Sequence, residues 1–120
     1  MKKIRTFEKA IEDKVKNLKE AGINPTLFWA YRHSMEAENE VIDFDEVIWD
    51  YDIEEIVATL RAEGIKEFTI SSTFSSLIPT LAEFEKHGIR MNGLTEVKQN
   101  YTDWQTGEKR RVPAIRMTVE

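Results

Sequence analysis

The sequence predicts one α/β domain over residues 1–120, close to the border with α+β, in which amphipathic helices cover a small mixed sheet. Apolar residues recur at spacings of three and four in four segments, which is the period of an amphipathic helix. A segment of alternating polarity lies between two of these helices, and two further β-like segments flank a turn near the C-terminal end. We therefore expect three or four strands in the order ααα-β-α-β-β, closing with a hairpin.

Two helices are predicted at the N-terminal end. The first begins near Thr6 as N-cap and ends at Gly22, where a left-handed C-terminal cap is expected. The second begins at Asn24-Pro25, which suits an N-cap followed by the first helical residue, and runs to about Met35. The apolar stripes are Ile4, Phe7, Ile11, Val15 and Leu18 in the first helix, and Leu27, Phe28, Tyr31 and Met35 in the second.

The middle of the chain contains one ambiguous segment and one clear helix. Residues 41–50 have apolar spacings that suit a helical turn and a β-branched content that suits a short strand, so both assignments stay open. A third helix follows from Asp52 to Gly64, with its stripe at Ile53, Ile56, Val57 and Leu60. Acidic residues crowd its first turn, where the helix dipole favours negative charge.

A strand–helix–strand unit is predicted next. In the strand over residues 65–71, Phe68 and Ile70 form one face, while Glu67 and Thr69 form the other. The helix that follows ends at Gly88, carries Pro79 in its first turn, and has its stripe at Phe74, Leu77, Ile78, Leu81 and Phe84. Because such crossovers are right-handed, the strands on either side of this helix should be parallel.

The C-terminal segments predict a hairpin. One strand begins near Ile89 and contains Gly93, which suggests a bulge. The turn at residues 105–108 contains Gly107 at a position suited to a left-handed conformation. Pro113 lacks a backbone N–H and so predicts that the last strand lies at a sheet edge.

Composition sets the broad class of the protein. There is no cysteine, which excludes disulfides, thiolate metal sites and a cysteine nucleophile. The N-terminal segment has no apolar stretch typical of a signal peptide, and no apolar run is long enough to cross a bilayer, so we expect a cytoplasmic protein. The net charge of −5 hides a strong asymmetry, because residues 36–55 hold ten carboxylates and no basic residue.

This acidic block is the first candidate site. Carboxylates beside large aromatic side chains can steer and anchor a basic partner protein, and an extreme form would imitate nucleic-acid phosphate. The alternative is an acidic face that is solvated and binds no partner. A metal site is not expected, because the spacing does not fit a calcium loop and no glycine is present. The predicted partner surface comprises Asp43, Asp45, Glu46, Trp49, Asp50, Tyr51 and Asp52.

A hydroxyl-rich turn is the second candidate. It joins a strand to a helix, a place where phosphates and carboxylates are often bound. It has no phosphate-loop glycine or lysine, and serine is also an ordinary helix N-cap. The weak candidate anion site comprises Ser71, Ser72, Ser75 and Ser76. A serine hydrolase would need a histidine base, and neither His33 nor His87 lies in a recognisable motif, so we predict no catalytic residue and no cofactor.

The hairpin is the third candidate. Basic residues interleaved with aromatic ones can hold nucleic acid, although opposite charges across a hairpin also stabilise it locally. The candidate nucleic-acid patch comprises Lys98, Tyr101, Trp104, Lys109, Arg110 and Arg111.

The stretch EVIWDYDIEEIVATLRAEGIKEFTISSTFSSLIPTLAEFEKHGIRMNGLTEV, with the following YTDWQTGEKRRVPAIRM, resembles a family of small uncharacterised proteins carried on conjugative and other mobile elements of gut Firmicutes. The resemblance covers about residues 41–118. It implies a bacterial accessory protein that acts in the cytoplasm, and it assigns no activity and no functional residue. We therefore expect a non-enzymatic protein–protein interaction module, with a nucleic-acid-associated accessory protein as the alternative.

Overall fold

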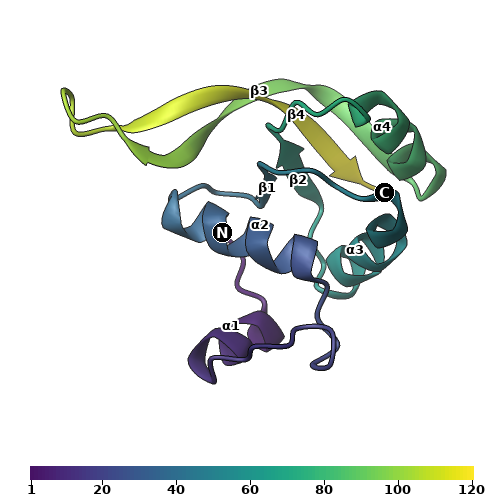
Figure 1. Cartoon of the computed structure of the whole chain (residues 1–120). Helices are drawn as coiled ribbons and strands as arrows, with labels where there is room; N and C mark the ends of the chain where they lie inside the picture. The colour runs from purple at the N-terminus through teal and green to yellow at the C-terminus, as the bar shows by residue number, and fades with distance from the viewer.

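The computed structural model describes all 120 residues, which form four helices and a four-stranded mixed sheet (Figure 1). The elements are α1 (Arg5–Glu12), α2 (Pro25–Glu36), β1 (Asp43–Phe44), α3 (Asp50–Ala62), β2 (Glu67–Ile70), α4 (Leu77–Lys86), β3 (Ile89–Thr102) and β4 (Lys109–Val119). The predicted α/β class is confirmed, and the observed order differs from the predicted one by the added strand β1. No helix has the length and apolarity needed to span a bilayer.

The sheet has the strand order β1-β2-β4-β3. Strand β1 is parallel to β2, and β4 is antiparallel to both β2 and β3. Strands β2 and β3 therefore run in the same direction, as predicted for the strand–helix–strand unit, but β4 lies between them. The prediction that the last strand is an edge strand is wrong. Pro113 is tolerated because β2 ends at the pair Ile70–Ile115, so β4 has only β3 as a neighbour at Pro113.

The ambiguous segment contains a short strand. Asp43 pairs with Thr69, and Phe44 pairs with Ile70, which adds β1 to the parallel edge of the sheet. Ile42, Asp43 and Phe44 are all buried. Apolar periodicity alone does not distinguish a short buried strand from a helical turn. Residues 43–44 form a strand because the edge of β2 is available for pairing.

The core lies between one face of the sheet and the helices. Phe68 is fully buried, with its ring centroid 5.4 Å from that of Phe44 and 5.4 Å from that of Phe84. The predicted burial of Phe68 and Ile70 is confirmed. Thr69, which alternation assigns to a polar face, is buried as well, and Ile78 of the predicted α4 stripe is 79% exposed. Alternation and periodicity thus identify most of the core but misplace residues whose surroundings depend on distant segments.

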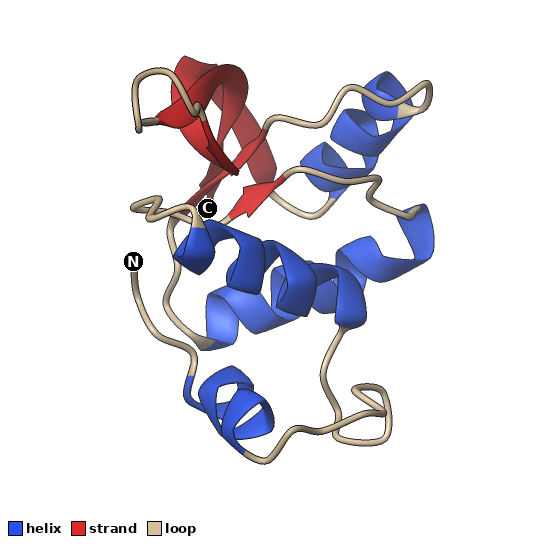
Figure 2. Ribbon diagram, turned by 60° about the vertical axis from the view of Figure 1, so that its left-hand side comes forward, coloured by secondary structure: helices blue, strands red, loops and turns tan.

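The first helix is shorter than predicted. It ends at Glu12, and Ile4, not Thr6, is its N-cap. Lys14 adopts a positive φ of 54°, and the chain then turns back so that Leu18 and Ile23 become buried. Figure 2 shows α1 as the short helix farthest from the sheet, followed by a loop that returns to the other helices. The contacts between α1 and α2 include aromatic pairs. The ring centroid of Phe7 lies 5.6 Å from that of Phe28 and 5.3 Å from that of Tyr31.

The second helix begins as predicted. Asn24 is its N-cap, since the side-chain oxygen accepts a hydrogen bond from the Leu27 N–H, and Pro25 is the first helical residue.

The hairpin of β3 and β4 is a long twisted ribbon whose tip extends well beyond the helices (Figure 1). The predicted bulge is confirmed, because the pairing shifts between Met91 and Leu94 and Gly93 has a φ of 81°. Gly107 has a φ of 74° in the tip turn, as predicted.

Candidate functional site

Two of the predicted sites meet at the carboxyl ends of β1 and β2. Because these strands are parallel, the acidic segment after Phe44 and the serine-rich turn after Ile70 leave the same edge of the sheet. The backbone N–H groups of Ser71 and Ser72 both donate to the Phe44 carbonyl. Two segments almost thirty positions apart in the sequence thus become neighbours. The sequence predicted them as two separate sites.

The buried carboxylate of Asp43 ties these two segments together. It is 4% exposed and accepts hydrogen bonds from the Thr69 hydroxyl at 2.7 Å and from the Ser71 hydroxyl at 2.6 Å. Burial raises the pKa of Asp43 above its ordinary value, and the two hydroxyl donors oppose that rise only in part. Asp43 is therefore a structural residue and does not belong to the exposed partner surface predicted from the sequence.

Asp52 does not belong to the exposed partner surface either. It is buried at the start of α3 and accepts hydrogen bonds from the Asn24 amide at 3.0 Å and from the Thr26 hydroxyl at 2.7 Å. The predicted acidic block is thus divided by the fold. Asp43 and Asp52 stabilise the junctions between elements, while the other eight carboxylates are exposed.

The serine-rich turn has little of what an anion site requires. The Ser71 hydroxyl is already engaged by a carboxylate, and the negative charge of ionised Asp43 beside it would repel a second anion. Ser76 occupies the N-cap position of α4, yet its side chain makes no capping hydrogen bond. Ser72 is half-buried and Ser75 is exposed. These residues form a connection between β2 and α4 in which Ser71 is the one serine with a defined side-chain partner.

Part of the exposed remainder of the acidic block, from Asp45 to Tyr51, combines carboxylates with aromatic side chains. Trp49 and Tyr51 are 53% and 75% exposed, and their rings are stacked with centroids 6.4 Å apart and planes 9° from parallel. We call this group the acidic–aromatic surface, and it comprises Asp45, Glu46, Val47, Trp49, Asp50 and Tyr51.

A hollow of about 150 Å³ separates this surface from α2. Trp29 and Ala30 line it from the helix, and Val47 and Trp49 line it from the acidic segment, together with Asp45 and Glu46. His33 connects the two sides, because its Nδ1 lies 3.2 Å from the Asp45 carboxylate. The acidic–aromatic surface is therefore held against α2 and continues into a small apolar depression.

Trp29 is the contributor that sequence reasoning missed. It is 45% exposed in the middle of α2. The available signal was its position outside the stripe formed by Leu27, Phe28, Tyr31 and Met35, since a tryptophan off the buried face of a helix must either be exposed or be covered by another element.

The hairpin patch is spread along the ribbon. Lys98 pairs directly with Arg111, and Lys109 lies two positions further along the same face of β4, whereas alternation places Arg110 on the opposite face. Tyr101 is 57% exposed and Trp104 in the tip turn is 82% exposed. Glu38 and Glu108 line the hollow beside Lys98, Lys109 and Arg111, so the charge there is mixed.

Comparison with known proteins gives one match. Residues 26–119 match a family described as a domain of unknown function, DUF7698. No curated protein and no solved structure matches the chain. The matched region begins inside α2 and includes the whole sheet, α3 and α4, with the acidic–aromatic surface and the hairpin inside it. Since the match covers more than three quarters of its length, the chain belongs to the DUF7698 family of domains of unknown function.

Proposed function

We propose that this domain is a non-enzymatic protein–protein interaction module that binds a basic partner protein through the acidic–aromatic surface. The observation that carries the proposal is the exposed stack of Trp49 on Tyr51 among unpaired carboxylates. Large aromatic side chains supply most of the binding energy in protein interfaces when a partner covers them. Exposed aromatic rings of this size among charges are typical of binding surfaces. Because they stay in solvent, they contribute little to the stability of the fold.

The stack is prepared for binding. The two rings lie parallel and offset, with their centroids 6.4 Å apart, and this preset arrangement lowers the conformational entropy that is lost on association. Trp49 immediately precedes α3, and Tyr51 lies in its first turn, so both rings are carried by rigid backbone.

The charges define the class of partner. Glu46 and Asp50 make no ion pair within the chain, and Asp45 pairs only with His33. Unpaired carboxylates on one surface attract a positively charged protein over several ångströms and raise its association rate. Lys or Arg side chains of the partner would meet the carboxylates, and an aliphatic or aromatic side chain would enter the depression between Trp29 and Trp49.

We also propose that the module acts in the bacterial cytoplasm as an accessory protein of a mobile element. This part of the proposal is supported by the resemblance over residues 41–118.

The experiment compares two exposed tryptophans. The wild-type chain and the variants Trp49→Ala and Trp104→Ala are immobilised, and binding proteins are captured from the bacterium that encodes the chain and identified by mass spectrometry. A basic protein captured by wild type should be lost with Trp49→Ala by about tenfold or more and retained with Trp104→Ala. Its association rate should also fall when Glu46→Lys and Asp50→Lys are combined, most strongly at low salt. Equal capture by both tryptophan variants would contradict the proposal.

A second candidate function rests on the hairpin. Trp104 and Tyr101 are exposed on a projecting ribbon that also carries Lys98, Lys109 and Arg111, an arrangement that could stack on bases and contact phosphates. We expect no DNA or RNA binding by the wild-type chain at physiological salt, because Glu38 and Glu108 lie among these cations. A salt-sensitive mobility shift that is abolished when Lys109, Arg110 and Arg111 are changed to Gln would favour this function over the first.

A further inference from the structure

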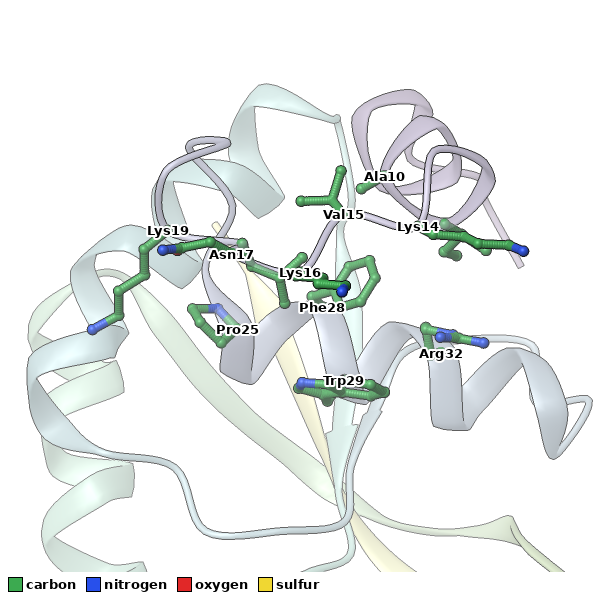
Figure 3. Close-up of a pocket in the computed structure, with 12 residues that line it drawn as sticks. Ala10, Lys14, Val15, Lys16, Asn17, Lys19, Pro25, Phe28, Trp29 and Arg32 are labelled. Carbon is green, nitrogen blue, oxygen red and sulfur yellow. The ribbon is translucent and has the colours of Figure 1, made fainter.

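A second, larger groove lies on the other side of Trp29. It encloses about 790 Å³ between α2 and the segment of residues 10–19. Figure 3 shows Trp29 and Pro25 on one wall, with Lys16 and Asn17 facing them across the gap. Half of the lining residues are apolar, and the charged ones are all basic, namely Lys14, Lys16, Lys19 and Arg32. In a chain with a net charge of −5, a groove lined by cations and no carboxylate is a marked local exception.

The charges of the chain are segregated between two segments. Residues 1–19 carry seven Lys or Arg and three Asp or Glu, a net +4, whereas residues 36–55 carry ten carboxylates and no cation. No ion pair within the chain joins these two segments. The fold does not neutralise the two segments against each other, so both remain available to a partner.

The two surfaces are adjacent. Trp29 and Pro25 line both the basic groove and the depression next to the acidic–aromatic surface. One face of the molecule therefore presents a basic half and an acidic half on either side of a half-exposed tryptophan. A surface with this arrangement is complementary to itself when a two-fold axis passes near its centre, because the rotation places each basic half against the other copy's acidic half.

We propose that the occupant of the basic groove is the acidic–aromatic surface of a second copy of this chain, in a two-fold symmetric dimer centred on Trp29. The inference rests on the proposed function, because it uses the same acidic–aromatic surface, and the occupant that it adds is a chain that is acidic overall and basic in this groove. In the dimer, Lys16 and Lys19 of one protomer face Glu46 and Asp50 of its partner, and the Trp49–Tyr51 stack of the partner enters the apolar part of the groove. Each contact occurs twice, and Trp29 of both protomers lies at the centre, where anchor residues concentrate.

The test is a charge swap between copies. In the acidified variant Lys16→Glu and Lys19→Glu are combined, and in the basified variant Glu46→Lys and Asp50→Lys are combined. Mass is measured by sedimentation at low ionic strength, about 0.01 M, where the Debye length is about 30 Å. Wild type should form a species of twice 14.0 kDa that dissociates as salt is added. Each variant alone should dimerise about tenfold more weakly or worse, and an equimolar mixture of the two should recover the dimer.

Two further variants act as controls. Combining Glu85→Lys with Glu108→Lys changes the net charge as much as the basified variant does, but on α4 and the hairpin tip, and should leave the dimer unchanged. Trp29→Ala should weaken the dimer without altering its salt dependence, because it removes an uncharged anchor. If a charge-reversed variant fails to fold by circular dichroism, the neutral changes Lys16→Gln, Lys19→Gln, Glu46→Gln and Asp50→Asn replace the reversals and should weaken the dimer to a smaller extent.

Several outcomes would overturn the dimer. A wild-type chain that stays at 14.0 kDa at every concentration and salt would show that a second copy does not occupy the groove. A mixture of folded variants that stays monomeric would show that the two halves do not face each other, and a series of growing oligomers would replace the two-fold arrangement with a head-to-tail one. The proposed function is judged separately, because capture of a basic protein that depends on Trp49 and not on Trp104 would support it even for a monomeric chain.

Discussion

Phe68 and Ile78 give the sharpest test of how the core is built. Both belong to apolar patterns in the sequence, yet Phe68 is 0% exposed and Ile78 is 79% exposed. Phe68 lies at the centre of β2 between the rings of Phe44 and Phe84, each at 5.4 Å. Truncation to alanine would leave a cavity bounded by two large rings, whose positions are fixed by β1 and α4.

The cost of Phe68→Ala follows from that burial. A buried phenylalanine removes about 150–250 Å² from water, which at about 25 cal/mol per Å² corresponds to roughly 4–6 kcal/mol. Because unfolded chains already bury part of this area, the measured loss should be about 3–5 kcal/mol, in line with other buried phenylalanines. For Ile78→Ala the change should be within about 0.5 kcal/mol, since the side chain is in solvent.

The assay is equilibrium unfolding in urea, monitored by far-ultraviolet circular dichroism, for wild type, Phe68→Ala and Ile78→Ala. The milder Phe68→Leu gives an intermediate point if the alanine variant is too unstable to fold, because a domain of this size has a total stability of only about 5–15 kcal/mol. A loss below about 1.5 kcal/mol for Phe68→Ala, or equal losses for Phe68→Ala and Ile78→Ala, would refute the assignment of this cluster as the centre of the core.

Two further predictions concern buried polar groups. Asp43→Asn should gain stability relative to wild type as the pH rises above 3.8, the ordinary pKa of an aspartate. Because the pKa of Asp43 is raised in the folded state, folded wild type binds more protons than the unfolded chain between the two pKa values. The stability of wild type therefore falls as the pH increases through this window. Urea midpoints of both proteins between pH 3.5 and 7 measure this, and a constant difference between them would contradict it. Asn24→Asp should lower the free energy of unfolding at neutral pH although aspartate caps helices as well as asparagine does, because the new carboxylate would face Asp52 in place of the amide that now donates at 3.0 Å. The loss should shrink as the pH is lowered and the carboxyl groups take up protons, and a variant as stable as wild type at neutral pH would show that Asn24 serves only as a cap.

Local signals in the sequence predicted most of the elements. Asn24-Pro25 marked the start of α2, and Gly93 and Gly107 marked the bulge and the hairpin turn, because each of these residue types has a backbone preference that acts within a few positions. The alternation around Phe68 located β2 for a similar reason. The end of α1 was not predictable in this way, because the chain reverses at Lys14, a residue type with no preference for positive φ, and Leu18 beyond it is buried by tertiary packing.

The candidate site was predicted in part. The sequence alone determined that the acidic block holds ten carboxylates beside aromatic residues, but the tertiary structure decided which of them face solvent. Asp43 and Asp52 are buried because Thr69, Ser71, Asn24 and Thr26 approach from other elements with hydrogen-bond donors that compensate for lost hydration.

The sequence therefore determined the class of this protein, most of its helices and strands, and the charge of its segments, because composition and short-range periodicity are properties of neighbouring residues. The tertiary structure decided that β4 lies between β2 and β3, that Trp49 and Tyr51 stack in solvent, and that a basic and an acidic surface meet at Trp29. These features depend on which distant segments pack together, and a burial pattern along one segment carries no information about the identity of the segment that covers it.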